Sequence, residues 1–387
     1  MKVLASALAF AGLAVAASLE HRQSPAPWSN YVKNGVFYPS QNAESWRTLY
    51  ARSLQLPDKS LLLSWEDYDP TVKLTYWPVY RSTDGGVSFR ELSRVEDQVN
   101  GWGNWYQPFF YELPQAVGDY PRGTILIAGA STPRNLSAAY IDIYASKDSG
   151  KTWAFVSHVV FGPGPETVRN GDKAVWEPFL MMYQGSLVCY YSTQADPNHA
   201  QKLSHKTTRD LKNWSAEVDD VAHPNYGDRP GMTTVAYSPN SRKYVMTFEY
   251  CGGPLAGGCP VYFKTAQNPL QFGSVQPLPI TPNDPNGNPN GSPYVIWTNQ
   301  GANGQGIFIM NGNSREEVFV NSDAVNPNGW KPVNLGHWAA YSRSLRVVTT
   351  PSNQKKLFIA NGGNIGCSGS CYNYVADALV DIPAYPA

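Results

Sequence analysis

Three glutamates stand at the ends of apolar, strand-like segments of this sequence. They are Glu66 in "SLLLSWE", Glu177 in "WEPF" and Glu249 in "TFEY". An ionised carboxylate beside a buried strand is costly unless it is paired or functional. Two carboxylates that face each other across a cleft can cleave a glycosidic bond, because one protonates the leaving oxygen while the other attacks the anomeric carbon or activates water. The structural alternative is pairing of these acids with Arg47, Arg229 and Arg343.

Aromatic residues cluster near these acids in the sequence. Trp102, Trp105 and Tyr106 lie in "NGWGNWYQP", Trp176 precedes Glu177, and Tyr341 begins "YSRS". Flat rings stack on the apolar faces of sugars with a large contact area and a small entropy loss. Core packing is the alternative role for any single ring, but the glycines of "GWGNW" favour a loop.

Other chemistries find little support in the sequence. The histidines show no metal-ligand spacing, and no Gly-x-Ser-x-Gly, phosphate-binding or GxGxxG motif occurs. We therefore expect no metal and no cofactor. Lys+Arg and Asp+Glu number 30 each, so the formal net charge is zero. This balance argues against nucleic acid or an anionic membrane as a partner, since both attract a basic surface.

A repeat of about sixty residues organises the chain. The turn "RSTDGGVSF" (81–89) recurs as "ASKDSGKTW" (145–153), with degenerate copies at 207–215, 265–272 and 321–330. In such Asp-box turns the aspartate and Ser/Thr side chains bond their own backbone and glycine supplies a positive φ. We assign Asp84 and Asp148 this structural role, because a Ca²⁺ loop would need further carboxylates.

Six pairs of apolar segments accompany the turns. Four of them begin with x-Pro, at 106, 176, 228 and 291, and two more begin near 45 and 341. Proline is tolerated at the first position of a strand. The pattern predicts an all-β fold, a six-bladed β-propeller with Asp-box turns, closed by the N-terminal segment.

The propeller predicts which residues surround the mouth of its central channel. The start of each inner strand and the end of the next strand lie on the same face of the ring. The first register holds Arg47, Gln107, Glu177, Arg229, Ser292 and Arg343; the second holds Glu66, Ala130, Ser192, Glu249, Asn311 and Asn361.

The N-terminus and the cysteines indicate secretion. Residues 1–18 read as a signal peptide, which leaves residues 19–387 as a single propeller domain. In an oxidising compartment we expect disulfides Cys251–Cys259 and Cys367–Cys371, with Cys189 buried in "SLVCYY". Asn135, Asn213 and Asn290 begin glycosylation sequons, although Pro293 weakens the third.

The segments "AVWEPF", "YGDRPGM" and "MTFEY", in this order, resemble fungal members of glycoside hydrolase family 93 over essentially the whole mature chain. The resemblance implies a retaining exo-α-1,5-L-arabinanase that releases arabinobiose from the non-reducing end of linear arabinan. It places the catalytic pair at Glu177, as nucleophile, and Glu249, as general acid/base, with the reverse roles left open. We expect a monomer that binds arabinan or arabino-oligosaccharides through Trp102, Tyr106, Gln107, Trp176, Asp228, Arg229, Tyr341 and Arg343.

Two other functions stay open at this point. A sialidase needs an arginine triad and a Tyr–Glu pair; the first-blade segment reads "SWRTLY" rather than Arg-Ile-Pro, but Arg47, Arg229, Arg343 and Tyr341 could serve. A carbohydrate-binding propeller without catalysis should repeat its binding residues in every blade. The acids occupy only three blades, which favours one asymmetric site.

Overall fold

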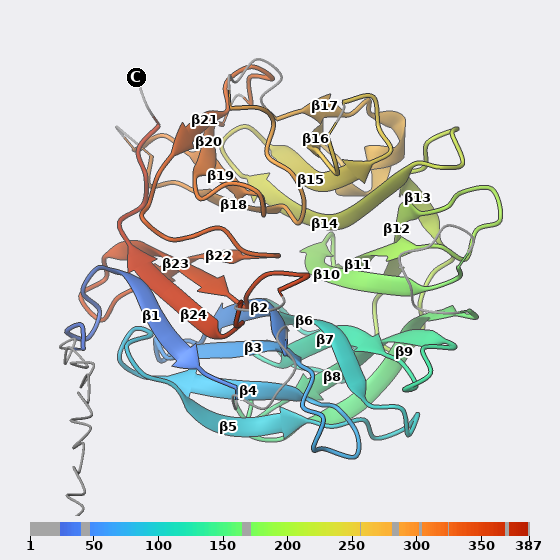
Figure 1. The fold of residues 1–387 in the computed structure, drawn as a ribbon, viewed down its shortest axis with the longest axis horizontal. Helices are drawn as coiled ribbons and strands as arrows, with labels where there is room; N and C mark the ends of the chain where they lie inside the picture. Colours follow the sequence, from blue (N-terminus) through green and yellow to red (C-terminus); the bar gives the residue numbers. More distant parts are fainter. Residues whose placement is uncertain are drawn as a thin grey trace, which may run out of the picture.

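The computed structural model of the chain describes residues 24–39, 47–164, 172–255, 257–280, 286–301, 304–323, 325–367 and 371–385. The predicted signal peptide lies outside the described residues. Six four-stranded antiparallel sheets surround a common centre, as Figure 1 shows, which confirms the predicted all-β six-bladed propeller. Within the described part of the chain, no helix is long and apolar enough to cross a membrane.

Each of the first five blades uses four consecutive strands, ordered from the centre outward. Blade 1 contains β2 (Thr48–Gln55), β3 (Leu61–Asp67), β4 (Trp77–Ser82) and β5 (Arg90–Val95); blade 2 contains β6 (Asn104–Glu112), β7 (Ile125–Ser131), β8 (Ala139–Ser146) and β9 (Ala154–Gly162). Blade 3 contains β10 (Val175–Tyr183), β11 (Ser186–Thr193), β12 (Lys202–Thr208) and β13 (Val218–Val221). Blade 4 contains β14 (Arg229–Ser238), β15 (Lys243–Cys251), β16 (Val261–Ala266) and β17 (Leu278–Pro279), with the short helix η1 (Pro269–Ser274) before β17. Blade 5 contains β18 (Tyr294–Thr298), β19 (Ile307–Asn311), β20 (Val318–Ser322) and β21 (Lys331–Val333).

Blade 6 closes the ring with both ends of the chain. Its inner strands are β22 (Ser344–Thr349), β23 (Lys355–Asn361) and β24 (Val375–Val380), and its outermost strand is β1 (Tyr31–Phe37). β1 pairs antiparallel with β24, with Tyr31 opposite Leu379. The N-terminal strand therefore covers the edge that the last blade would otherwise leave unpaired, as the sequence predicted.

The two best copies of the repeated turn make matching hydrogen bonds. The Ser82 hydroxyl donates to Asp84 at 2.7 Å, and Asp84 accepts the Ser88 N–H at 3.0 Å. In the second turn the Ser146 hydroxyl donates to Asp148 at 2.8 Å, and Asp148 accepts the Thr152 N–H at 2.9 Å. These carboxylates are used within their own turns, so they are not available for chemistry elsewhere.

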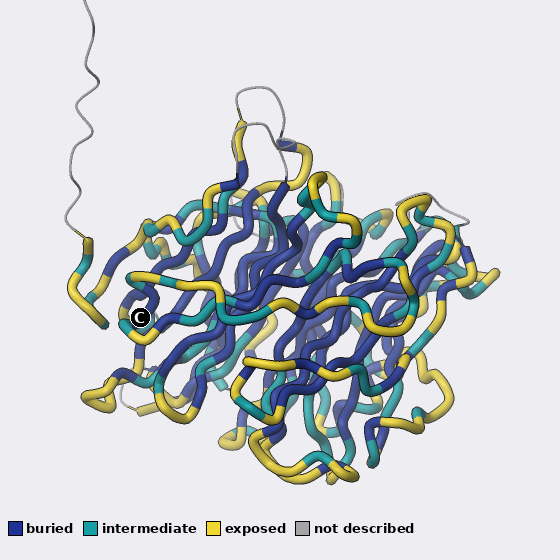
Figure 2. Tube along the Cα trace, turned by 90° about the horizontal axis from the view of Figure 1, so that it is seen from below, coloured by how far each residue is buried: buried dark blue, intermediate teal, exposed yellow. Residues whose placement is uncertain are grey.

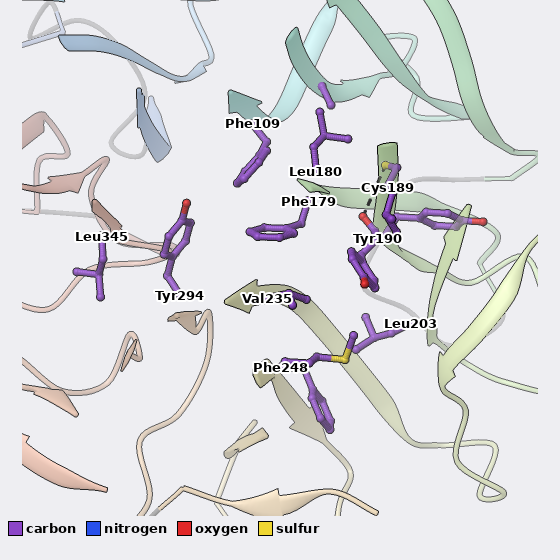
Figure 3. Close-up of a cluster of buried hydrophobic side chains, with 14 of the residues drawn as sticks. Phe109, Phe179, Leu180, Cys189, Tyr190, Leu203, Val235, Phe248, Tyr294 and Leu345 are labelled. Atoms are coloured by element: carbon purple, nitrogen blue, oxygen red, sulfur yellow. Dashed lines mark hydrogen bonds between the residues drawn. The ribbon is translucent and has the colours of Figure 1, made fainter. Parts of the chain in front are cut away.

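Buried apolar side chains make up the core, and most of the exposed residues lie in loops and outer strands (Figure 2). Burial of this apolar surface provides the main driving force for folding. At the centre of the ring, Phe109, Phe179 and Tyr294 from three different inner strands gather around the channel, as Figure 3 shows. All three side chains line a second cavity, of about 500 Å³, between the inner strands.

Each inner strand is entered through a residue of left-handed backbone conformation. The residues are Tyr50, Gln107, Glu177, Met232, Ser292 and Ser342, with φ between 46° and 62°. In blades 1 to 4 the strand pairing slips at this residue, as in a β-bulge. Such a conformation is strained for residues other than glycine and is typical of functional sites.

The predicted inner register coincides with this left-handed residue at Gln107, Glu177 and Ser292. In the other three blades the left-handed residue is Tyr50, Met232 or Ser342. The expected Arg47 and Arg229 therefore lie three positions early and Arg343 one position late.

Candidate active site

A cavity of about 920 Å³ opens at the face where the inner strands begin. Its lining includes all three glutamates singled out in the sequence, together with aromatic, amide and arginine side chains. The residues used below are Glu66, Tyr68, Trp105, Tyr106, Gln107, Trp176, Glu177, Gln201, Arg229, Glu249, Cys251, Cys259 and Tyr341. The cavity is therefore assembled from segments of several blades, as expected for the mouth of a propeller channel.

Glu177 is the bulge residue of blade 3 and is buried. Its Oε2 accepts the Ser192 hydroxyl at 2.5 Å and the backbone N–H of Met232, from blade 4, at 2.7 Å. Burial raises the pKa of Glu177, while these two hydrogen bonds and the nearby Arg229 favour its ionised form. Both hydrogen bonds fall on one oxygen.

Glu249 ends the apolar part of β15 and reaches the same cavity. Its Oε2 accepts one hydrogen bond, from the backbone N–H of Ser292 at 2.8 Å. Burial and the negative charge of Glu177 raise the pKa of Glu249 to about 7. A carboxylic acid that keeps its proton near neutral pH is suited to general acid catalysis.

The two carboxylates approach the same point in space. A Cβ atom built on Gly231 would lie 3.3 Å from Oε1 of Glu249 and 3.4 Å from Oε2 of Glu177. The two oxygens are therefore at most about 6.7 Å apart, because their separation cannot exceed the sum of those two distances. This upper bound is compatible with the roughly 5–5.5 Å between the carboxyl groups of retaining glycosidases, and it lies near the lower limit for inverting ones.

Glu66 provides a third buried carboxylate in the cavity. It accepts the Tyr68 hydroxyl at 2.5 Å on Oε2 and the Gln107 backbone N–H at 2.9 Å on Oε1. Burial raises the pKa of Glu66 to about 7. The Gln107 side chain in turn accepts the backbone N–H of Glu177 at 3.3 Å, so Gln107 links Glu66 to Glu177.

These contacts form a series around the ring. The backbone N–H groups of the left-handed residues Gln107, Glu177, Met232 and Ser292 each donate to a side chain of the preceding blade. The acceptors are Glu66, Gln107, Glu177 and Glu249. Because the left-handed bulge turns each N–H toward the neighbouring blade, the backbone itself orients all three glutamates.

Five of the eight residues expected to bind substrate line the cavity: Tyr106, Gln107, Trp176, Arg229 and Tyr341. The Arg229 guanidinium donates to Gln201 at 3.1 Å. Burial among the carboxylates raises the pKa of Tyr341 well above its ordinary value, so its hydroxyl stays protonated.

The other three lie outside the cavity lining. Trp102 stacks on Tyr140, with ring centroids 5.5 Å apart, and Asp228 accepts the Tyr250 hydroxyl at 2.6 Å. Arg343 is 1% exposed and donates to backbone carbonyls, among them that of Arg315 at 2.6 Å. Arg343 therefore braces the entry to the last blade, and the arginines whose charge favours the ionised form of Glu177 are Arg229 and Arg52.

The arginine arrangement also bears on the sialidase alternative. Arg47 forms ion pairs with Asp67 at 2.8 Å and Asp69 at 2.7 Å. Arg47 and Arg343 lie outside the cavity lining, so Arg229 is the member of the supposed triad that lines the cavity. Among the described residues, the lining contains Arg229 and Arg134, and the three arginines of the supposed triad do not converge there.

Sequence reasoning omitted several cavity residues from the expected binding set. Trp105 had been noted among the aromatics, and it lines the cavity where Trp102 does not. Tyr68 follows Glu66 by two positions, and this spacing on a strand end could have indicated it. Gln201 lies in a loop outside both registers, so no repeat position pointed to it.

Both expected disulfides are present, and Cys189 is a free, buried thiol. Cys251 and Cys259 line the cavity, and their sulfur atoms and a carboxylate oxygen of Glu249 all lie within 4.8 Å of one another. Because the two sulfurs are bonded to each other, this group is a wall of the cavity rather than a set of metal ligands.

Comparison with known proteins begins with two negative results: no family model and no curated protein matches the chain. Solved structures do match. An α-L-arabinofuranosidase of glycoside hydrolase family 93 from Fusarium graminearum, solved with arabinobiose, is 40% identical with a TM-score of 0.86, covering 91% of this chain and 98% of that chain. An α-L-arabinanase from Penicillium chrysogenum, also solved with arabinobiose, is 37% identical with a TM-score of 0.85 and the same coverage.

More distant matches show the fold alone. A sialidase from Streptococcus pneumoniae shares 10% identity with a TM-score of 0.55 over 91% of this chain and 71% of that chain. The identity to the two fungal enzymes extends over nine-tenths of the chain, which confirms the resemblance noted in the sequence: the chain belongs to glycoside hydrolase family 93.

Proposed function

We propose that this protein is a secreted, retaining exo-α-1,5-L-arabinanase that releases arabinobiose from the non-reducing end of linear arabinan. The observation that carries the proposal is the approach of the Glu177 and Glu249 carboxylates to one point beside Gly231, inside a cavity of about 920 Å³. The two fungal relatives were solved with arabinobiose, which supports the choice of substrate. The two disulfides support an extracellular location.

Glu177 is proposed as the nucleophile. Ser192 and Met232 both donate to its Oε2, which leaves Oε1 to attack the anomeric carbon. Their hydrogen bonds and the charge of Arg229 stabilise the carboxylate form that attack requires. Attack forms the bond between Glu177 and the sugar while the bond to the leaving oxygen breaks.

Glu249 is proposed as the general acid/base. With a pKa raised to about 7, it holds the proton that the leaving oxygen of the shortened chain needs. After transfer, the ionised Glu249 accepts a proton from water as that water attacks the anomeric carbon and releases Glu177. Two displacements on the same carbon retain the configuration.

Neutral sugar recognition is proposed for the aromatic and amide groups of the cavity. Tyr106, Trp176 and Tyr341 offer ring faces, while Gln107 and Arg229 offer hydrogen-bond donors to hydroxyl groups. A net charge of zero suits an uncharged polysaccharide. We infer a monomer, since a complete set of cavity residues comes from one chain.

The test is the product profile on linear arabinan. We expect arabinobiose as the main product from the earliest time points, resolved by chromatography. A ladder of many oligomers at early times would overturn exo action. Hydrolysis of a sialoside with no release from arabinan would overturn the proposed substrate.

A further inference from the structure

Gly231 lies where the two proposed catalytic carboxylates converge. It sits between Pro230 and the bulge residue Met232 and pairs with Glu249 across β14 and β15. Its φ lies outside the left-handed region that favours glycine. Glycine weakens a strand interior, and within strands it often marks a close approach of a ligand or another backbone. The backbone conformation therefore does not explain why this position lacks a side chain.

The surroundings of Gly231 explain the glycine. A Cβ atom there would lie 2.9 Å from Nε2 of Gln201, 3.3 Å from Oε1 of Glu249 and 3.4 Å from Oε2 of Glu177. All three neighbours line the cavity. These distances are at or below the shortest ordinary van der Waals contacts of a methyl group, so the missing side chain is what lets both carboxylates and the Gln201 amide lie this close to the backbone.

The proposed reaction depends on the positions of these two carboxylates. In the proposed mechanism the anomeric carbon must come within about 3–3.5 Å of a Glu177 oxygen, while the glycosidic oxygen must lie within hydrogen-bond distance of Glu249. A methyl group 3.3 Å from Glu249 and 3.4 Å from Glu177 would push both carboxylates out of these positions. We propose that Gly231 is a positioning residue whose missing side chain lets Glu177 and Glu249 converge at the reaction centre, an inference that rests on the proposed function.

Gln201 offers a second route by which a side chain at this position could act. Its Nε2 donates to the Pro230 carbonyl at 2.8 Å, and its Oε1 accepts from Arg229 at 3.1 Å. A methyl group 2.9 Å from Nε2 would displace the Gln201 amide and break its hydrogen bond with Arg229. A direct obstruction of the carboxylates and an indirect displacement of Gln201 are therefore separable by experiment.

The first experiment compares Gly231→Ala with Gly227→Ala on linear arabinan. We expect Gly231→Ala to lose at least 100-fold in kcat/KM, mostly in kcat, because the rest of the sugar-binding cavity is intact. A Cβ on Gly227, in the loop directly before β14, would meet only Asn225 Oδ1 at 3.9 Å, so Gly227→Ala should keep wild-type turnover. Thermal denaturation should show both variants folded, since the contacts of the new methyl are side-chain ends. Retention of activity within about threefold by Gly231→Ala would overturn the proposal.

The second experiment repeats Gly231→Ala in a Gln201→Ala background, where the 2.9 Å contact no longer exists. The proposal expects the same factor of loss relative to Gln201→Ala alone. Disappearance of that loss would assign the effect to Gln201 and overturn the proposal. Failure of the proposed function is distinguishable, because then the wild-type protein and Gly227→Ala would both leave linear arabinan uncut.

Discussion

The backbone N–H of Met232 donates a hydrogen bond to Oε2 of Glu177 at 2.7 Å, although the two residues belong to neighbouring blades. Both residues have left-handed backbone conformations, with φ of 58° and 62°. The strained bulge of one blade thus supplies the donor that holds the carboxylate of the preceding blade. A repeated structural device of the propeller thereby becomes part of the proposed catalytic site.

The roles of Glu177 and Glu249 are distinguishable by azide rescue. We expect Glu249→Ala to lose about 10²–10⁴ in rate, the range typical of general acid–base catalysis, and Glu177→Ala to lose at least as much. With an activated aryl substrate, azide should rescue Glu177→Ala to an inverted glycosyl azide and Glu249→Ala to a retained one. Product stereochemistry by NMR checks both; the opposite pattern would exchange the roles.

Ser192 is expected to tune the proposed nucleophile. Ser192→Ala removes the 2.5 Å hydrogen bond to Glu177, so the pKa of Glu177 should rise and the acidic limb of the kcat/KM profile should move to higher pH. At the optimum we expect about a tenfold loss, since a hydrogen bond to a charged group contributes about 1.5–3 kcal/mol.

Ser64→Ala is the matched control for Ser192→Ala. Ser64 is also buried on the second strand of its blade, and its Oγ has no hydrogen-bond partner among the described residues. Its profile should overlay that of the wild type. An unmoved acidic limb in Ser192→Ala would show that this serine does not act on Glu177.

Much of this architecture could be predicted from the sequence, because the repeat fixes the blade count and the strand order. The register at the end of the second strand was predictable too. Glu66 pairs with Leu49 and Glu249 pairs with Gly231, and each partner directly precedes the bulge residue of its blade. A carboxylate at the end of an apolar strand is a strong signal, since it is tolerated there only with specific partners.

The inner register was harder to predict, because x-Pro is not a fixed marker of it. Proline directly follows the left-handed residue at Gln107, Glu177 and Ser292, whereas Pro230 precedes the left-handed residue Met232 by two positions. Aligning the blades on proline therefore displaced the fourth. Trp102 and Trp105 look alike in the sequence, and only packing of Trp102 on Tyr140 separates them.

Glu66 should make stability depend on pH. Burial raises its folded pKa to about 7, from an ordinary value of 4.5. Its contribution is fully present below pH ~4.5 and is lost as pH rises through ~7, because the folded protein must then ionise a buried acid. Glu66→Gln should therefore be more stable than the wild type at pH 8, by at most about 3 kcal/mol, and not at pH 5.

Thermal or urea denaturation at both pH values checks the prediction for Glu66. The comparison at pH 5 is the internal control, since the wild-type carboxyl is protonated in the folded state there. An equal difference in unfolding free energy at pH 5 and pH 8 would contradict a raised pKa for this group.

The two disulfides should differ in their effect on activity, since only one of them borders the cavity. Cys251 and Cys259 line it beside Glu249, whereas Cys367 and Cys371 are absent from its lining. The double variant Cys251→Ser/Cys259→Ser should admit water to Glu249, lower its pKa from about 7, and move the basic limb of the activity profile to lower pH. The double variant Cys367→Ser/Cys371→Ser should lose stability but keep the pH–activity profile of the wild type. Thermal denaturation measures the stability, and initial rates on linear arabinan across pH measure the profile. Identical basic limbs in both variants would show that the Cys251–Cys259 disulfide stabilises the fold without shielding the proposed general acid.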